Sequence, residues 1–285
     1  MNAPIDILRV YLGGLRRHPW TAVCVLLCVA GMLDLAVRHD EVPKALAYLS
    51  AMLACVFVVD LFARWFPTGT TLPVRRPERE ALFVSICEVI AVLALVVRFN
   101  LLDWDSLPGL ARLAFLPAMG FIFPIVLPLL LLWWRYKPAE LGIHFHTMCW
   151  VFVPVLFITA GTAYLVAPDE FTLGELLASK GVLGTLVTGF ITAGLTEEFV
   201  RMAMQTRFGA YLRSPAAGWF IASVIWAFLH SPKWYAESAD LYEALMGAVR
   251  IIPLGLMWGY MTHRTKSLLP ATLVHGMNVW GLQNF

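Results

Sequence analysis

Residues 81–98 read ALFVSICEVIAVLALVVR, an apolar run that holds one carboxylate, Glu88, before it ends at Arg98. A transmembrane helix needs about 20 consecutive, mostly apolar residues, and this run is close to that length. Runs of the same kind recur along the whole chain instead of forming one anchor beside a polar domain. The pattern predicts an all-α fold, a polytopic transmembrane helix bundle.

The composition of the chain indicates the same class. Of the 285 residues, 60% are hydrophobic and 14% are charged, whereas about 25% of an ordinary soluble domain is charged. The formal net charge of +2 is spread between apolar runs, so we expect no nucleic-acid partner. No disulfide framework is predicted, because each cysteine lies in or beside an apolar run: Cys24, Cys28, Cys55, Cys87 and Cys149.

Windows of about 20 residues between charged and proline-containing breaks predict nine spans. The count is eight if either the 215–231 segment or the short final segment is re-entrant. The predicted spans are 19–37, 45–65, 81–98, 112–134, 148–167, 181–206, 215–231, 243–261 and 267–282.

Lysine and arginine lie before the first span and in every alternate loop after it, whereas the intervening loops are acidic. Basic loops stay in the cytoplasm, so this alternation predicts a cytoplasmic N-terminus and a C-terminus outside. We expect a multi-pass integral protein of a bacterial inner membrane, with the lipid bilayer as its first partner. Its oligomeric state is not readable from the sequence.

Two adjacent carboxylates, Glu197 and Glu198, lie inside the sixth predicted span, with Arg201 one turn later. On a helix the guanidinium of Arg201 can reach either carboxylate. One interpretation is a neutralised pair that merely lets the helix insert. A second buried carboxylate adds a cost of several kcal/mol that such a pair does not need, so we favour a functional site.

Three further polar groups lie in the last third of the chain: His230 after the motif Trp226-Ala227-Phe228-Leu229, and His275 and Asn278 three residues apart. A purely structural interpretation would place His230 at an interfacial helix end and give His275 and Asn278 interhelical hydrogen bonds. A carboxylate, two imidazoles and an amide are together the parts of a water-activating hydrolase. Gly276, beside His275, predicts the close approach of another backbone. Elsewhere, Asp60 precedes Arg64 by one turn, and we expect these two to pair near the cytoplasmic surface.

At these residues the chain resembles the CAAX protease and bacteriocin-processing family of intramembrane glutamic endopeptidases, which includes the eukaryotic Ras-converting endopeptidase. Its motifs are Glu-Glu-x-x-x-Arg, Phe-x-x-x-His and His-x-x-x-Asn on successive helices. The counterparts are Glu197 to Arg201, Trp226 to His230 and His275 to Asn278, and the segment Tyr136 to Ile143 resembles the Pro-x-x-Leu-Gly stretch ahead of that core. The resemblance covers residues 135–285, the predicted catalytic core, and leaves 1–134 as accessory transmembrane helices.

The sequence departs from the family in three places. The arginine comes one residue early, tryptophan replaces phenylalanine, and the asparagine follows its histidine by three residues rather than four. Aligned on the paired glutamates, Glu197 is the catalytic base; aligned on Arg201, Glu197 takes the second glutamate position and Thr196 the first. We prefer the first alignment and keep Glu198 as the alternative base.

The resemblance implies that Glu197 and His230 activate a water molecule and that His275 and Asn278 stabilise the oxyanion. No cofactor is then expected. A zinc enzyme with Glu197, His230 and His275 as ligands ranks second, because no familiar ligand spacing is present. The expected substrate is a membrane-associated protein or peptide. The alternatives are a non-catalytic scaffold or immunity protein of the same fold, and a proton-coupled transporter that uses Glu88, Glu197 and His230.

Overall fold

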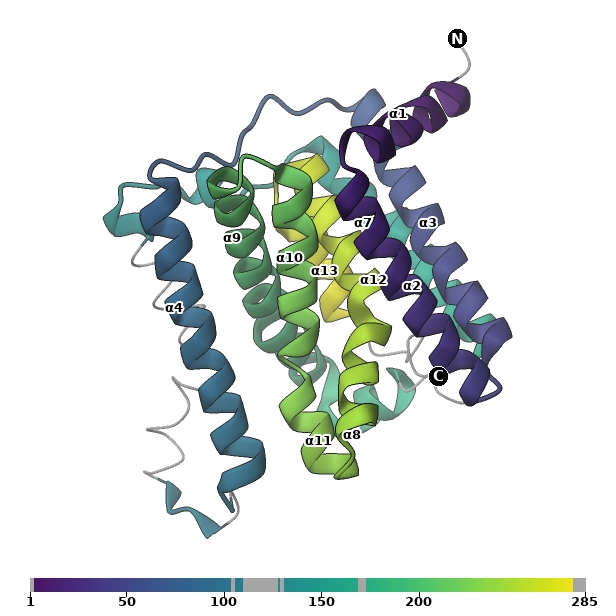
Figure 1. Cartoon of the computed structure of the whole chain (residues 1–285), viewed down its shortest axis with the longest axis vertical. Helices are drawn as coiled ribbons and strands as arrows, with labels where there is room; N and C mark the ends of the chain where they lie inside the picture. The colour runs from purple at the N-terminus through teal and green to yellow at the C-terminus, as the bar shows by residue number, and fades with distance from the viewer. Residues whose placement is uncertain (1–2, 104–105, 110–127, 129–130, 169–172, 279–285) are drawn as a thin grey trace.

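The computed structural model describes residues 3–103, 106–109, 128, 131–168 and 173–278, and this part of the chain is helical, without a strand (Figure 1). The helices are α1 (Ala3–Arg17), α2 (Pro19–Arg38), α3 (Val42–Trp65), α4 (Pro77–Val96), η1 (Val97–Leu101), η4 (Pro138–Leu141), η5 (Thr147–Val151), α7 (Phe152–Val166), α8 (Leu173–Leu186), η7 (Val187–Leu195), α9 (Thr196–Tyr211), α10 (Pro215–Phe228), α11 (Ser231–Ser238), α12 (Leu241–Thr265) and α13 (Leu269–Gly276).

Five of these helical stretches are long and apolar enough to cross a membrane: Pro19–Arg38, Val42–Trp65, Pro77–Leu101, Thr147–Val166 and Leu241–Thr265. They confirm five predicted spans to within a few residues. Leu177–Leu186 and Gly189–Tyr211 are bent by 47° and make a sixth if they count as one span. Most of the predicted span 112–134 and the end of 267–282 lie outside the described residues, and α10, the helix in the predicted span 215–231, has 14 residues and is not among the five. The structure therefore supports a multi-span bundle without confirming nine.

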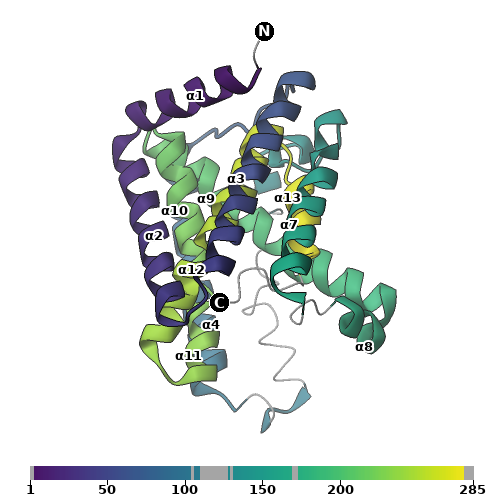
Figure 2. The same ribbon diagram turned by 90° about the vertical axis from the view of Figure 1, so that its right-hand side faces the viewer.

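The basic segments of the sequence gather at one end of the bundle, where α1 and the start of α4 lie (Figure 1). Tyr11 of α1 donates a hydrogen bond to Asp60 at the end of α3 (2.7 Å), and Arg207 of α9 pairs with Glu80 of α4 (3.2 Å). Helix α1 runs across this end of the bundle (Figure 2). The alternation of basic and acidic loops therefore predicted correctly which segments lie together.

The expected pairing of Asp60 with Arg64 is wrong. Asp60 accepts hydrogen bonds from Tyr11 and Tyr260 and pairs with Arg264 (2.8 Å), whereas Arg64 lies 3.8 Å from Asp6 of α1. The carboxylate of Asp60 is buried against α12, and this burial favours the partners that other helices supply.

Helix α12 is the central helix. Within its most apolar window 72% of the residues are buried, against 17% for α2. Gly255 lets α10 approach closely, because a Cβ atom there would lie 2.8 Å from the ring of Trp226. The outer helices instead present large apolar side chains outward, such as Leu53 of α3 and Leu165 of α7.

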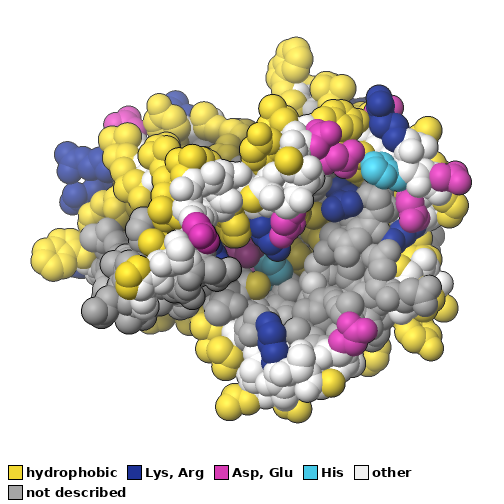
Figure 3. All heavy atoms as spheres, turned by 90° about the horizontal axis from the view of Figure 1, so that it is seen from below, with side chains coloured by type: hydrophobic (Ala, Val, Ile, Leu, Met, Phe, Trp, Pro, Cys, Tyr) yellow, Lys and Arg dark blue, Asp and Glu magenta, His cyan; other side chains and the backbone are white. Residues whose placement is uncertain are grey.

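The opposite end of the molecule also has large apolar side chains on its outer side. Seen from that end, hydrophobic side chains project around much of the outline, and charged side chains lie mainly within it (Figure 3). An apolar circumference with charged ends is the surface expected of a bundle whose sides face lipid.

Candidate active site

The paired glutamates lie in the first turn of α9, directly after the π-helix η7. The hydroxyl of Thr196 donates to the carbonyl of Ile191 five residues earlier (2.8 Å), which matches the wider π-helical turn. Consecutive helical residues point in different directions, so the two carboxylates face different surroundings. The side chain of Glu198 is completely buried, whereas that of Glu197 is 30% exposed.

Glu198 forms the buried ion pair with Arg201. Its other oxygen, Oε1, accepts a hydrogen bond from Nδ1 of His275 (2.8 Å). The guanidinium of Arg201 also lies over the rings of Trp226 and Trp258, at 5.3 and 5.4 Å from their centroids. The charge of Glu198 is thus compensated by Arg201, and each of its two oxygens has a side-chain partner.

Glu197 faces a different set of groups. Its Oε2 atom accepts a hydrogen bond from the indole N–H of Trp226 (2.6 Å). The Nε2 atoms of His275 and His230 lie 3.5 and 3.7 Å from the same oxygen. The structure therefore brings together three predicted site residues that the chain separates by up to 78 positions (275 − 197).

His230 lies at the junction of α10 and α11. Helix α10 begins at Pro215 after Ser214, whose hydroxyl accepts from the N–H of Ala217 (3.3 Å). The ring of His230 stacks on Trp234 at 5.5 Å, and its Nδ1 lies 3.1 Å from the carbonyl of Trp226. With Nδ1 donating to this carbonyl, Nε2 is the nitrogen directed at Glu197.

His275 is held in the short helix α13 between aromatic and backbone contacts. Its ring stacks on Trp258 with 4.0 Å between centroids and 13° between planes. The prediction for Gly276 is confirmed, because a Cβ atom there would lie 2.8 Å from the carbonyl oxygen of Gly189 in η7. This close packing places His275 beside the start of α9.

The segment that resembles Pro-x-x-Leu-Gly supports the turn before α13. Gly142 has a left-handed φ of 75°, and its carbonyl accepts from the N–H of Leu268 (3.0 Å). The hydroxyl of Ser267 donates to the carbonyl of His144 (2.7 Å). Burial, and then the neighbouring His146, lower the pKa of His144. A neutral His144 suits this packed position, since a charged ring there would lose solvation.

Asn278 lies two residues beyond the end of α13 and is half-buried. Its backbone N–H donates to the carbonyl of His275 (2.9 Å), which keeps the two residues close together. Side-chain contacts join Glu197, Glu198, Arg201, His230 and His275.

Two indoles were missed as site residues. Trp226 was identified only as a departure from a phenylalanine motif, yet it donates to Glu197. Trp258 was not singled out, although it stacks on His275. For Trp226 the available signal was the polar N–H of an indole within an apolar run, since a buried indole N–H usually has a partner.

No three His, Cys, Asp or Glu side chains in the described part of the chain are grouped so as to hold a metal ion. A zinc ion binds nitrogen and oxygen ligands at about 2.0–2.2 Å. Glu197, His230 and His275 carry suitable donor atoms but would have to rearrange around such an ion. The zinc alternative therefore requires a direct test.

Residues 179–281 match the family described as Type II CAAX prenyl endopeptidase Rce1-like. All six predicted site residues lie in this range, and the resemblance drawn from the three motifs is confirmed there. A UPF0761 membrane protein from Alkalilimnicola ehrlichii is 26% identical over 136 residues, which cover 45% of this chain and 30% of that protein. The aligned region thus spans less than a third of the relative. No solved structure matches the chain.

Proposed function

We propose that this chain, whose residues 179–281 are similar to Type II CAAX prenyl endopeptidases, is an intramembrane endopeptidase that uses a glutamate base. The observation that carries the proposal is that the two carboxylates have different partners. Arg201 pairs with Glu198, so Glu197 is left facing His230, His275 and the indole of Trp226. A half-buried carboxylate next to two imidazoles is suited to activating water.

In the first step, a water molecule beside Glu197 and His230 attacks the carbonyl carbon of the scissile peptide bond. Glu197 takes one proton from that water as the new carbon–oxygen bond forms, and His230 orients the water through Nε2. The hydrogen bond from Trp226 holds the Oε2 atom in place (2.6 Å). Fixing the base in this way removes the entropic cost of finding the reactive geometry.

The oxyanion that forms in this step needs hydrogen-bond donors. Nε2 of His275 and the amide of Asn278 supply them in our proposal. Glu198 accepts from Nδ1 of His275 (2.8 Å), so a donating Nε2 requires protons on both ring nitrogens. Arg201 already compensates the charge of Glu198, so Asn278 supplies the donor when His275 carries the Nδ1 proton alone.

In the second step, the tetrahedral intermediate collapses and the carbon–nitrogen bond breaks. Glu197 returns its proton to the leaving nitrogen, which departs as an amine. The products are a carboxylic acid and an amine, and Glu197 ends the cycle as a carboxylate. No cofactor takes part in this scheme.

We further propose that the end of the bundle that carries α1 and the start of α4 is cytoplasmic, in a bacterial inner membrane. Its arginine-rich segments support this orientation. A reporter inserted within residues 67–76 should report the cytoplasm, and one fused after Phe285 should report the outside. A cytoplasmic reporter after Phe285 would contradict the odd number of spans.

The substrate class in this proposal is a membrane-associated protein or peptide. The test is co-expression with four tethered candidates: a prenylated C-terminal peptide, a bacteriocin leader, a C-terminal sorting tail and a transmembrane signal protein. Cleavage by the wild type should disappear in Glu197→Gln, which keeps the shape of the side chain and removes the base.

The matched control is Glu237→Gln, at an exposed position of α11, which should leave cleavage unchanged. Persistent cleavage by a folded Glu197→Gln variant would refute the glutamate mechanism. A folded wild-type protein that cleaves none of the four would favour the scaffold or immunity alternative.

A further inference from the structure

A basic pocket lies between the start of α4 and the end of α9, at the end of the bundle where the arginine-rich segments gather. It has a volume of about 580 Å³, and its charged lining consists of Arg76, Glu78, Arg79 and Arg213, with Tyr211 beside them. Two segments, 76–79 and 210–213, supply this lining and lie 131 residues apart (210 − 79). The fold, and not one stretch of sequence, therefore creates the pocket.

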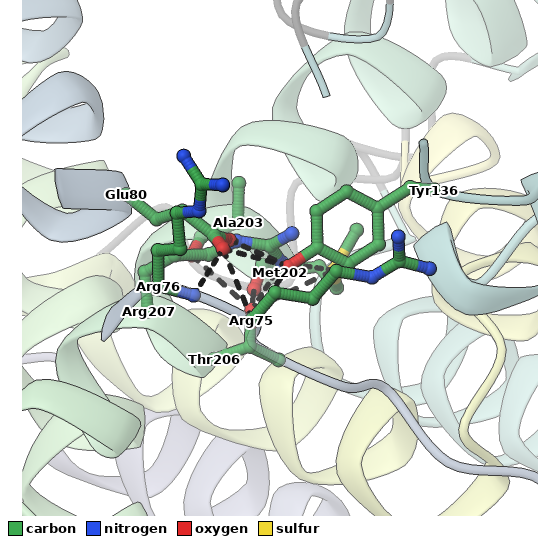
Figure 4. Close-up of polar contacts among 8 residues, drawn as sticks. All are labelled: Arg75, Arg76, Glu80, Tyr136, Met202, Ala203, Thr206 and Arg207. Carbon is green, nitrogen blue, oxygen red and sulfur yellow. Dashed lines mark hydrogen bonds and ion pairs between the residues drawn. The ribbon is translucent and has the colours of Figure 1, made fainter. Parts of the chain in front are cut away.

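A second carboxylate of α4, Glu80, lies next to this lining in the sequence and already has partners. Glu80 is completely buried and accepts hydrogen bonds from the hydroxyl of Tyr136 (2.8 Å) and the backbone N–H of Arg76 (2.8 Å). It also pairs with Arg207 of α9 (3.2 Å). Figure 4 shows these groups converging on Glu80. Glu80 therefore compensates the charge of Arg207 and links α4 to α9.

The arginines of the pocket are left without such compensation. Arg76, Arg79 and Arg213 form no ion pair among the residues that the structure describes. The lining carries three guanidiniums and one carboxylate, Glu78, so its formal charge is +2 (3 − 1). Unpaired guanidiniums that converge from two elements attract an anion.

The chemistry of the lining favours a phosphate group among anions. Guanidinium groups present planar, paired N–H donors that match phosphate oxygens, and the phenol of Tyr211 adds a neutral donor. The first backbone N–H groups of α4 also lie at this end and carry a partial positive charge. Glu78 opposes binding, so the arginines must supply most of the attraction.

The position of the pocket is that of a phospholipid headgroup. The candidate span Pro77–Leu101 begins at the pocket, so the lining lies where the apolar stretch gives way to charged residues. Basic pockets at the ends of transmembrane helices bind anionic lipid headgroups. Tyr211 lies 14 residues along α9 from Glu197, a rise of about 21 Å. The pocket is therefore separate from the candidate active site.

We propose that this pocket binds a phosphate group, carried either by an anionic lipid headgroup or by free phosphate. The full-length purified chain is tested with two probes: mixed micelles of phosphatidylglycerol compared with phosphatidylcholine, read by native mass spectrometry, and inorganic phosphate, read by equilibrium dialysis. Preferential retention of phosphatidylglycerol identifies the lipid as the source. Binding of inorganic phosphate alone identifies a soluble source.

The pocket variant is the triple substitution Arg76→Gln, Arg79→Gln and Arg213→Gln. Loss of even one charge-assisted contact of about 1.5–3 kcal/mol corresponds to at least about tenfold weaker binding. The matched control, Arg16→Gln, Arg17→Gln and Arg135→Gln, removes the same charge from exposed positions outside the pocket and should bind like the wild type. If the triple pocket variant does not fold, Arg79→Gln alone is measured in its place.

Two results would overturn the proposal. One is a wild-type chain that binds neither probe. The other is binding that falls equally in the folded pocket variant and in the control, which would mean a diffuse charge effect and not a site. Peptide cleavage does not enter either measurement, so the result is independent of the proposed enzymatic function.

Discussion

Removing the cation of the buried pair in α9 should destabilise the protein strongly. Arg201 and Glu198 have side chains that are 1% and 0% exposed. Substitution Arg201→Met keeps most of the apolar stem and removes the guanidinium, which leaves Glu198 with His275 as its remaining side-chain partner. Breaking a buried pair from one side typically costs about 3–5 kcal/mol, because the other charge is left uncompensated. We expect a loss of that size in the free energy of unfolding.

The second variant, Glu198→Gln with Arg201→Met, removes both charges. Because no uncompensated carboxylate remains, the double variant should recover most of the stability lost by Arg201→Met. The control is Lys233→Met, which breaks a pair whose side chains are 52% and 57% exposed; exposed pairs contribute about 0.2–1 kcal/mol. The assay is reversible unfolding in mixed detergent micelles, followed by circular dichroism.

Two results would refute this reasoning. A loss below about 1 kcal/mol for Arg201→Met would place the pair in the range of exposed ion pairs. A double variant as unstable as Arg201→Met would mean that the guanidinium acts through its contacts with Trp226 and Trp258 instead of through its pairing with Glu198. Either result would also weaken the argument that Arg201 leaves Glu197 available for chemistry.

Three further predictions concern the site. Asn278→Ala should lower kcat for peptide cleavage by about 10²–10³, the usual loss for one oxyanion donor; an unchanged kcat would remove Asn278 from the mechanism. Gly276→Ala should destabilise the protein by about 1–3 kcal/mol, since its Cβ would meet the carbonyl of Gly189 at 2.8 Å, whereas Gly161→Ala, with no atom within 4 Å, should not. Equal unfolding midpoints would contradict that packing. Cleavage should survive dialysis against a chelator, and loss that zinc restores would make Glu197, His230 and His275 metal ligands.

Apolar periodicity and loop charge were sufficient to predict much of the fold. Five predicted spans coincide with helices because a bilayer permits few charged side chains over about 20 residues, and this constraint is local in the sequence. Loop charge predicted that the basic segments share one end, because basic loops stay on one side of the membrane. The span 181–206 was less predictable, because hydropathy does not encode the π-helix η7 or the 47° bend.

Residue types in the sequence also led to the candidate site. Glu197, Glu198, His230 and His275 are costly groups within apolar runs or at their ends, and it was their combination that indicated a site. Trp258 could not be identified in this way, because an indole is common in an apolar helix and its stacking on His275 depends on how α12 meets α13.

Only the tertiary structure decided which carboxylate is paired with Arg201 and which faces His230 and Trp226. Helical spacing lets Arg201 reach either glutamate. The choice of Glu198 follows from surroundings that the chain assembles from α10, α12 and α13: Trp226 donates to Glu197, and His275 donates to Glu198. The same applies to Asp60, whose nearest cation in the sequence, Arg64, pairs elsewhere while Arg264 of α12 takes its place. Residue types determine which groups need partners. Packing between distant helices determines which partners they have, because a buried charge is stabilised by the groups within a few ångströms of it in space, wherever these lie along the chain.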